Sequence, residues 1–586
     1  MHNFTDEQKK FLESKGNIVL HACPGSGKTF VVAQKLMQYI KEWSRPHQGV
    51  AVLSFTNVAS EEIQKQANEL TSGGIQIDYP HFVGTLDSFI NSFILLRFGY
   101  LLLESPQRPT IAFKDLYSLP FRFWRRDCHQ KGCVEGISSF RWDMNRNLLR
   151  NKEPVSCTGG TYGPPCYQYK TMLLKRGLVF QSEVSGLTYW LLKDNPQIAQ
   201  ALAARFPIII LDEAQDTSVE QMAVLDLVNQ AGIESMFLVG DPDQSIYEWR
   251  DASPECFIAK MNCEGWETLP LTTNFRSSQH ICNATQAFAK SLEAASPSIS
   301  KGKYADCTQK PVLLFYSGNV NDCRVQLIDK FLGMCKDNDV DLNPKNIAIV
   351  TRSKIYSDTD ISGLWKSRDV EFLAQAAYEW FGGSRKKAYE FCERALFSIL
   401  IKEYRNIVAS IEIDVEEKMP YESWRLIVIE VLIRLPSIDQ SIKNWIAQTC
   451  GMLKEVFALM CVSIRPDLEV DNVIKIKSRD KTVPHFNDIP LRNFFENKSV
   501  NNYTLSSIHG VKGETYDAVL LIVESKTGKT ITPTFLNEDD IDQELMRIAY
   551  VAMTRPRKLL VVAMPDVKSR TVHPRFPKDK WDYMVM

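Results

Sequence analysis

A glycine-rich segment near the start of the chain has the residue types that bind phosphates. It reads Ala-Cys-Pro-Gly-Ser-Gly-Lys-Thr and lies between an apolar run and a helical pattern. The backbone N–H groups of such a turn, at the positive end of a helix dipole, attract phosphate oxygens. The lysine would reach the β- and γ-phosphates, and the threonine hydroxyl would bind Mg²⁺. The segment predicts a phosphate-binding P-loop formed by Ala22, Gly25, Ser26, Gly27, Lys28 and Thr29.

Two adjacent carboxylates follow a second apolar run, Ile208–Leu211. Parallel sheets place their chemistry at the carboxyl ends of the strands. We expect Asp212 to hold Mg²⁺ and Glu213 to polarise an attacking water as the general base. The alternative is a charged helix start, which acidic residues also favour. The upstream P-loop favours the catalytic interpretation.

The elements that must position these residues alternate between short apolar strands and helices. This alternation is typical of doubly wound α/β domains, and continuous apolar runs indicate strands covered on both faces. Strand patterns lie near residues 15–20, 49–53, 82–86, 206–211, 236–239, 312–315, 347–350, 503–506, 518–523 and 559–563.

Two mostly helical segments interrupt this alternation and divide the chain. We expect a first α/β domain over 1–94 and 204–278 with an insertion over 95–203. We expect a second α/β domain over 279–369 and 491–586 with an insertion over 370–490. The first insertion carries Cys128, Cys133, Cys157 and Cys166. Their spacing differs from the usual Cys-x-x-Cys metal knuckle, so free thiols are expected over a zinc or iron–sulfur site.

Composition excludes several classes of protein. The chain has 586 residues, of which 44% are hydrophobic, and a net charge of −1. It is therefore an ordinary globular chain, and any nucleic-acid binding would use local basic grooves. The start of the chain lacks the pattern of a signal peptide, and its longest apolar run, Phe93–Leu103, is too short for a bilayer. We expect a cytoplasmic protein with reduced cysteines and no membrane span.

Seven further segments occur in an order and spacing that resemble a known family. They are Phe4–Gln8, Ser54–Ala59, Gly84–Phe89, Val239–Arg250, Leu271–Ser277, Ser507–Gly513 and Arg547–Arg555. With the P-loop and Asp212–Asp216, they resemble the UvrD/Rep/PcrA-like branch of superfamily 1 helicases over nearly the whole chain. The resemblance implies two RecA-like domains, each interrupted by an insertion, with ATP and Mg²⁺ bound between them. It also implies 3′-to-5′ movement on single-stranded DNA and strand separation at duplex junctions.

The resemblance assigns roles to single residues of the ATP site. Gln8 would read the adenine, and Phe275, which is usually Tyr in the family, would stack on it. Gln244 would sense the γ-phosphate. Arg276 and Arg555 would be arginine fingers that stabilise charge on the transferred phosphoryl group.

Other residues match family positions that contact DNA. Single-strand binding needs aromatic faces for the bases and cations for the phosphates. The aromatic matches have core packing as their alternative. The predicted DNA contacts are Phe55, Thr85, Tyr247, Trp249, Arg250 and His509.

The sequence departs from the family at two of the motifs. Asp87 stands where relatives usually have His, which puts a DNA contact there in doubt. Thr515 aligns with the family Glu that contacts the nucleotide ribose, and whether Glu514 replaces it stays open.

Three functions are compatible with these motifs. The first is a free-standing helicase in DNA repair or replication restart. The second is a helicase subunit similar to the UvrD-like subunit of Gabija-type anti-phage systems, because of its short build and the form of Ser507–Thr515. There the family's partner is a separate OLD-type nuclease with ATPase and Toprim domains. The third is a sensor that binds nucleotide and DNA without unwinding, against which Glu213 and the two arginines argue.

Overall fold

The computed structural model describes two compact units. Its described residues are 4–70, 77–103, 108–112, 139–150, 152–155, 165–289, 298–318, 320–352, 368–400, 415–416, 418–460, 490–496, 502–523, 543–566 and 574–586. One unit comprises Met1–Phe98, Ser185–Ile355 and Ser499–Met586, and the other comprises Gly99–Val184 and Tyr356–Lys498. Among the helices that the structure describes, none combines the length and the apolar character needed for a membrane span.

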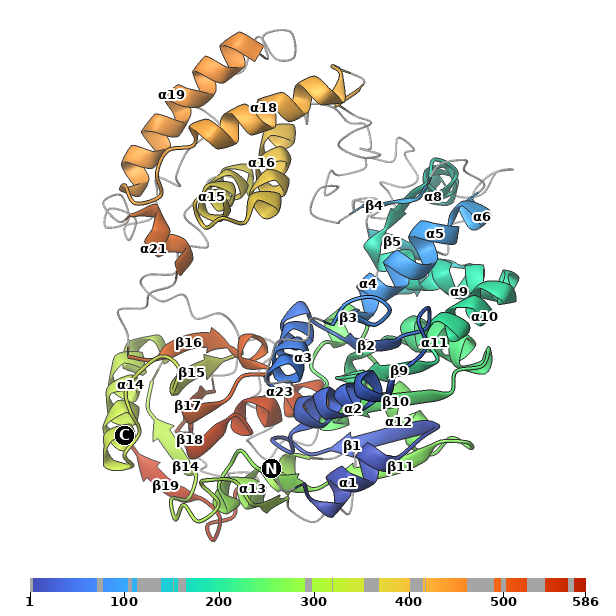
Figure 1. The fold of residues 1–586 in the computed structure, drawn as a ribbon. Coiled ribbons are helices and arrows are strands. Elements are labelled where there is room, and N and C mark those ends of the chain that lie inside the picture. Colours follow the sequence, from blue (N-terminus) through green and yellow to red (C-terminus); the bar gives the residue numbers. More distant parts are fainter. Residues whose placement is uncertain are drawn as a thin grey trace. The chain divides into compact units, whose positions relative to one another are not determined.

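The first unit contains a parallel sheet that carries the P-loop (Figure 1). Within the described residues its order is β11-β1-β10-β9-β2-β3. Helices α1 (Asp6–Glu13), α2 (Lys28–Glu42) and α3 (Asn57–Glu69) cover one face and enclose an apolar core. The strands are β1 (Asn17–Ala22), β2 (Val50–Ser54), β3 (Phe82–Thr85), β9 (Ile208–Leu211), β10 (Ser235–Gly240) and β11 (Glu267–Leu271).

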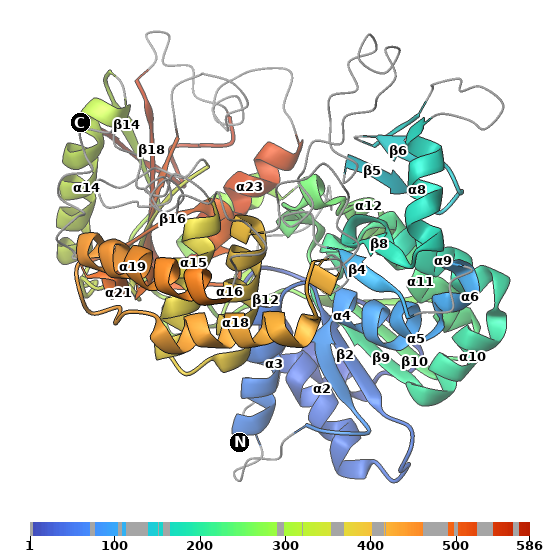
Figure 2. The ribbon, with the colours of Figure 1, turned by 90° about the horizontal axis from the view of Figure 1, so that it is seen from above.

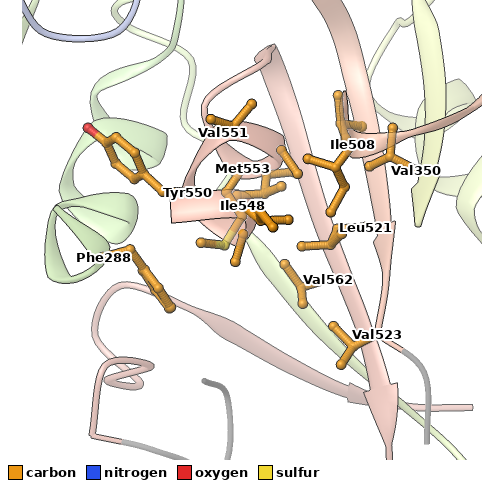
Figure 3. Close-up of a cluster of buried hydrophobic side chains, with 14 of the residues drawn as sticks. Phe288, Val350, Ile508, Leu521, Val523, Ile548, Tyr550, Val551, Met553 and Val562 are labelled. Carbon is orange, nitrogen blue, oxygen red and sulfur yellow. The ribbon is translucent and has the colours of Figure 1, made fainter. Parts of the chain in front are cut away.

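A second parallel sheet lies in the same unit, with the order β16-β15-β17-β18-β14-β19 among the described residues. Helix α14 (Val320–Asp337) covers one face. The other face packs against α13 (Gln279–Thr285) and α23 (Gln543–Met553), and Figure 3 shows apolar side chains of α23 against this sheet. The strands are β14 (Val312–Tyr316), β15 (Ile347–Thr351), β16 (Thr504–Ser507), β17 (Tyr516–Ile522), β18 (Pro556–Pro565) and β19 (Asp582–Val585).

Shorter elements connect the two sheets and lead into the insertions. The 3₁₀ turns η5 (Pro242–Gln244) and η6 (Glu248–Arg250) follow β10 and carry predicted site residues. The others are α4 (Leu86–Ile90), α5 (Leu96–Phe98), α9 (Val184–Asp194), α10 (Pro196–Arg205), α11 (Val219–Gln230), α12 (Pro254–Met261), β12 (Thr273–Asn274), β13 (Ile299–Ser300) and η9 (Ile508–Val511).

The other unit contains Gly99–Val184 of the first predicted insertion and the described part of the second, whereas most of α9 and all of α10 lie in the first unit. Figure 2 labels helices and strands of both insertions. The second insertion is helical where it is described, with α15 (Arg368–Phe381), α16 (Arg385–Leu400), α18 (Tyr421–Arg434), α19 (Ile442–Met460) and α21 (Leu491–Glu496). The first insertion contains α6 (Tyr100–Leu103), α8 (Pro165–Lys175), β4 (Thr110–Ala112), β5 (Phe140–Trp142), β6 (Leu148–Arg150), β7 (Glu153–Pro154) and β8 (Leu178–Phe180).

The predicted α/β class with two parallel sheets is confirmed. Each predicted strand is present, although its ends shift by a few residues. The sequence did not indicate α1, β11, β19 or the short strands of the first insertion. The single-residue limits of the four predicted segments stay a prediction, because both sheets belong to one compact unit.

Candidate active site

The P-loop connects the end of β1 to the start of α2. Gly27 caps α2 with a φ of 81°, and Gly25 has a φ of 72°, both in the left-handed region that favours glycine. A Cβ atom on Gly25 would lie 2.7 Å from the Cβ of Arg276. Glycine is therefore needed for both backbone conformation and space. Lys28 is the first residue of α2 and is buried.

The carboxyl end of β9 brings Asp212 to the P-loop. The backbone N–H of Asp212 donates to the Leu53 carbonyl at 2.8 Å, and the Thr29 hydroxyl donates to the Asp212 carboxylate at 3.4 Å. Burial, together with the charge of Glu213, raises the pKa of Asp212 to about 7, although Lys28 opposes the shift. A buried carboxylate beside a hydroxyl is an oxygen donor set that fits Mg²⁺.

Glu213 adopts a backbone conformation that is rare for a residue with a side chain. Its φ is 55°, and such outliers often mark functional sites. Its carboxylate accepts a hydrogen bond from the Gln215 side chain. Desolvation raises the pKa of Glu213, but the positive charges of Lys28 and Lys512 outweigh it, so the net pKa is lowered. The carboxylate is therefore ionised at neutral pH, as a general base requires.

The predicted phosphate sensor and arginine fingers approach from both sheets. Arg555, which precedes β18, donates from Nη2 to the Gln244 side-chain oxygen at 2.6 Å. Arg276 donates from Nη1 to the Thr554 carbonyl at 3.1 Å. Desolvation, followed by the charge of Arg555, lowers the pKa of Arg276 well below its usual value. A triphosphate would offset the charge of cations gathered in this way, so these residues fit ATP.

The predicted adenine contacts lie beside the P-loop. The Gln8 side chain closes the capping box of α1 with Thr5 and donates to the Ser26 carbonyl at 3.4 Å. The Phe275 backbone N–H donates to the Gly25 carbonyl at 2.8 Å, and the residue as a whole is 39% exposed. An exposed ring beside the P-loop fits a stacking surface.

Asn274 is a site residue that the sequence reasoning missed. Its Oδ1 accepts from the backbone N–H groups of Arg276 at 2.7 Å and Ser277 at 2.8 Å, and its Nδ2 donates to the Pro24 carbonyl at 2.8 Å. This buried side chain therefore fixes the strand end that carries Phe275 and Arg276 against the P-loop. Its position inside the motif Leu271–Ser277 is the sequence feature that could have identified Asn274 as a site residue.

Two predicted base-stacking residues contact each other. The rings of Phe55 and Tyr247 stack with centroids 5.0 Å apart and an interplanar angle of 27°. Lys512 Nζ lies 4.5 Å from the Tyr247 ring centroid, and the Arg250 guanidinium lies 6.0 Å from it. Aromatic faces and cations are thus brought together, which is the combination that single strands require.

Two of the remaining predicted DNA residues, Thr85 and His509, are held by hydrogen bonds within the protein, and the side chain of Trp249 is not described. The Thr85 hydroxyl caps α4 by accepting from the Ser88 N–H at 3.1 Å. His509 bonds through Nε2 to the Ile246 carbonyl at 3.1 Å. Trp249 belongs to η6, but its side chain is outside the described structure. The DNA contacts of all six predicted residues stay predictions.

Further polar contacts were not indicated by the sequence. Lys512 forms an ion pair with the buried Asp216, and Arg547 forms one with Glu248. Asp87 accepts a hydrogen bond from the Gln221 side chain at 2.8 Å. The segments that contain Lys512 and Arg547 were recognised as motifs, but their partners lie hundreds of residues away.

The cysteine prediction falls mostly outside the described residues. Cys128, Cys133 and Cys157 are among the residues that the structure does not describe, and Cys166 is buried in α8. Within the described ranges, no group of three or more His, Cys, Asp or Glu side chains is arranged to hold a metal.

Two family models match the chain. The UvrD/REP helicase N-terminal domain matches residues 4–111 and 162–262. The UvrD-like helicase C-terminal domain matches residues 477–566. The matched residues include the P-loop, the carboxylates after β9, Gln244 and Arg555.

The similar proteins include a Gabija protein and several DNA helicases. The Gabija protein GajB of Bacillus cereus (strain VD045) is 28% identical over 284 residues, which is 48% of this chain and 48% of GajB, or about half of each. DNA helicase II of Rickettsia typhi is 24% identical over 96% of this chain and 92% of its own length. The ATP-dependent DNA helicase PcrA of Staphylococcus aureus (strain Mu50) is 20% identical over 96% of this chain and 83% of its own length.

Proposed function

Because the chain belongs to the UvrD-like family and is thereby an ATP-dependent DNA helicase, we propose that it moves 3′-to-5′ on single-stranded DNA and separates strands at duplex junctions. The proposed direction rests on the family resemblance, and the observation that supports coupling of hydrolysis to movement is the hydrogen bond from Arg555 to Gln244 at 2.6 Å. This contact joins the sheet that carries the P-loop to the sheet that carries Arg555. Hydrolysis at that place would therefore change the relation between the two sheets.

The roles of the ATP-site residues follow from their positions. Lys28 and the P-loop N–H groups bind the phosphates, while Thr29 and Asp212 would hold Mg²⁺. When bound, Mg²⁺ supplies positive charge that offsets the charge on the phosphate oxygens. Glu213 orients the attacking water and accepts its proton. Arg276 and Arg555 stabilise the charge that develops on the phosphoryl group.

The single strand would cross the surface that contains Phe55 and Tyr247. Bases stack on these rings, and Arg250 and Lys512 offset the negative charge of the phosphates. Asp216 pairs with Lys512 and lies next to the Glu213 segment, so the DNA surface adjoins the hydrolytic site.

ATP hydrolysis by the purified chain tests this proposal. We expect single-stranded DNA to stimulate hydrolysis strongly, and Glu213→Gln to lower the stimulated rate by at least about 100-fold, because the base is lost. Glu234→Gln is the matched control, since Glu234 pairs with Arg45 on the surface. Stimulation that persists in Glu213→Gln would exclude Glu213 as the base. A wild-type chain that binds ATP without hydrolysing it would favour the sensor alternative.

Polarity requires a separate experiment. A partial duplex with a 3′ single-stranded tail should be unwound faster than one with a 5′ tail. Equal unwinding of the two substrates, or preference for the 5′ tail, would contradict the proposed direction.

We further propose that the helicase acts in anti-phage defence with a separate OLD-type nuclease. The similarity to GajB supports this role, although that alignment spans about half of each chain. Co-expression with the product of the neighbouring gene, followed by size-exclusion chromatography, tests for a complex. Full unwinding by the chain alone, with no complex, would instead favour a free-standing repair or replication-restart helicase, which the longer alignments to DNA helicase II and PcrA support.

A further inference from the structure

Three loops at one edge of the first sheet bring aromatic and basic side chains together. His47, Tyr79 and Arg205 each stand three residues before a strand, which is β2, β3 and β9 respectively. These strands are parallel neighbours, so the three residues lie at the amino edge of the sheet, whereas the P-loop follows a strand at the carboxyl edge. Arg97 of α5 adds a second arginine that acts on Arg205. We call His47, Tyr79, Arg97 and Arg205 the edge patch.

Backbone and side-chain contacts hold these loops in place. The Gly49 backbone N–H donates to the Arg205 carbonyl at 2.9 Å. A Cβ atom on Gly49 would lie 1.9 Å from the Pro80 carbonyl oxygen, so only glycine fits where these loops meet. His47 Nδ1 and the Tyr79 hydroxyl are hydrogen-bonded at 3.2 Å. The edge patch is therefore largely ordered before a partner binds, which lowers the entropy that is lost on binding.

The two arginines of the edge patch lie over aromatic rings. The Arg205 guanidinium lies 5.1 Å from the Tyr79 ring centroid and 4.3 Å from that of Phe206, which is buried. The Arg97 guanidinium lies 5.2 Å from the Phe93 ring centroid, and the rings of Phe93 and Phe206 meet edge to face at 4.9 Å. Such contacts hold a guanidinium by its face. Its N–H groups lie in the guanidinium plane, so they stay able to donate to an anion.

Within the described part of the chain, neither arginine of the edge patch has an ion-pair partner. Desolvation by burial lowers the pKa of Arg205; Tyr79 opposes the shift, and the positive charge of Arg97 adds to it. Arg205 Nη1 is buried and has no acceptor among the described residues. Tyr79, by contrast, is 68% exposed. The edge patch thus combines two uncompensated cations with an exposed ring that is held in place, which suits an anion beside an apolar group.

The charges around the edge patch favour a protein partner over a nucleic acid. Asp78 is exposed beside Tyr79, and Glu234, at the same edge before β10, pairs with Arg45. A phosphate chain binds a row of cations and would be repelled by these carboxylates. A single carboxylate of a protein can approach the two arginines alone. Tyrosine and arginine are also enriched among the residues that dominate protein–protein binding.

We propose that the edge patch is a docking site for an acidic segment of a partner protein. A carboxylate of the partner accepts hydrogen bonds from Arg205, Arg97 adds its charge, and an apolar side chain beside that carboxylate packs on Tyr79. The inference goes beyond the proposed function, because the edge patch contains none of the residues assigned to ATP or DNA. The five residues of β2 separate it from Phe55 by roughly 16 Å, so DNA and this partner can bind at the same time.

The probe that tests the inference is a fluorescently labelled peptide rich in Asp and Glu that contains tyrosine, and fluorescence anisotropy measures its binding. A non-hydrolysable ATP analogue with Mg²⁺ and unlabelled single-stranded DNA are present in excess to occupy the other cationic surfaces. We expect Arg205→Gln to weaken binding of the peptide at least about tenfold, and Tyr79→Ala at least about threefold. Lys10→Gln is the matched control, because Lys10 is an exposed cation of the same unit that pairs with Glu267. This variant should bind the peptide as the wild type does.

Two further measurements separate loss of the edge patch from loss of the fold. Arg205→Gln should hydrolyse ATP at the wild-type rate and bind single-stranded DNA with wild-type affinity. If it does not fold, Arg97→Gln at its exposed position decides, with binding of the peptide at least about threefold weaker. A wild-type chain that does not bind the peptide, or unchanged affinity in the variant that decides, would overturn the inference. Loss of DNA affinity in a folded Arg205→Gln would assign the edge patch to nucleic acid and would overturn it as well.

Discussion

At the scale of the residue, Asp212 predicts a pH dependence of metal binding. Its pKa is raised to about 7, first by burial and then by Glu213. Below this pH the carboxyl group is protonated, and a proton competes with Mg²⁺. The effect of Mg²⁺ on nucleotide affinity should therefore weaken about tenfold between pH 8 and pH 6. Titration of a fluorescent ATP analogue, with Mg²⁺ and with chelator at each pH, measures the effect of Mg²⁺ on nucleotide affinity.

The matched variant for this prediction is Asp212→Asn. The amide does not titrate, so the Mg²⁺ effect should be small in this variant and should keep only the pH dependence of the nucleotide's own phosphates. An equal pH dependence in wild type and Asp212→Asn would show that another group is responsible. Glu213 does not supply the dependence, because its pKa is lowered and it remains ionised over this range.

At the scale of the element, Lys35 of α2 bonds to the end of α1, in addition to the apolar packing between the two helices. Lys35 is buried, and its Nζ donates to the carbonyls of Phe11 at 3.0 Å, Leu12 at 2.8 Å and Ser14 at 2.6 Å. These carbonyls belong to the end of α1, where a helix leaves its last acceptors unpaired. Since α1 also carries Gln8, this lysine supports the adenine side of the site.

Lys35→Met should free the end of α1. Buried carbonyls that lose their donor cost about 1–3 kcal/mol, so the free energy of local opening of α1 should fall by about that amount. Hydrogen exchange of the α1 amides measures the change. Lys41→Met, at an exposed position near the end of the same α2 helix, should have little effect. Equal protection of α1 in the wild type and Lys35→Met would contradict this account.

Strands with continuous apolar runs were predictable from the sequence, whereas the edge strands β11 and β19 were not. Ile208–Leu211 is fully buried, so its continuous apolar run identified β9. Strand β11 contains Pro270 and exposed positions at an edge of its sheet, and β19 is exposed along its length, so neither has a clear apolar pattern.

Site residues were likewise predictable where they are close in sequence to the elements that position them, and not where their partners are distant in sequence. The P-loop and the carboxylates after β9 are adjacent in sequence to the elements that position them, and their motifs predicted where they lie. The partners of Lys512 and Arg547 depend on how two sheets meet. Asp216 and Lys512 are separated by 296 positions, and no spacing rule connects them.

At the scale of the whole molecule, the near-zero net charge conceals a local concentration of cations. Lys28, Arg276 and Arg555 come from separate segments of the chain, all three interact electrostatically with Glu213, and Arg555 also acts on Arg276. Like charges that face one another favour separation until an anion offsets them. Nucleotide binding should therefore draw the two sheets together, and the second sheet would respond through Arg555.

Hydrogen exchange with a non-hydrolysable ATP analogue tests this coupling. In the wild type, the analogue should protect both the start of α2, which follows the P-loop, and α23, whose end leads to Arg555. In Arg555→Met, protection of α2 should remain while that of α23 is lost, because the P-loop still binds phosphate but the second sheet no longer contacts it. Lys41→Met, at the exposed position near the end of α2, should behave as the wild type. If α23 is protected as strongly in Arg555→Met as in the wild type, the sheets close without this arginine. Arg276 or residues 245–248 would then transmit the nucleotide state to the second sheet.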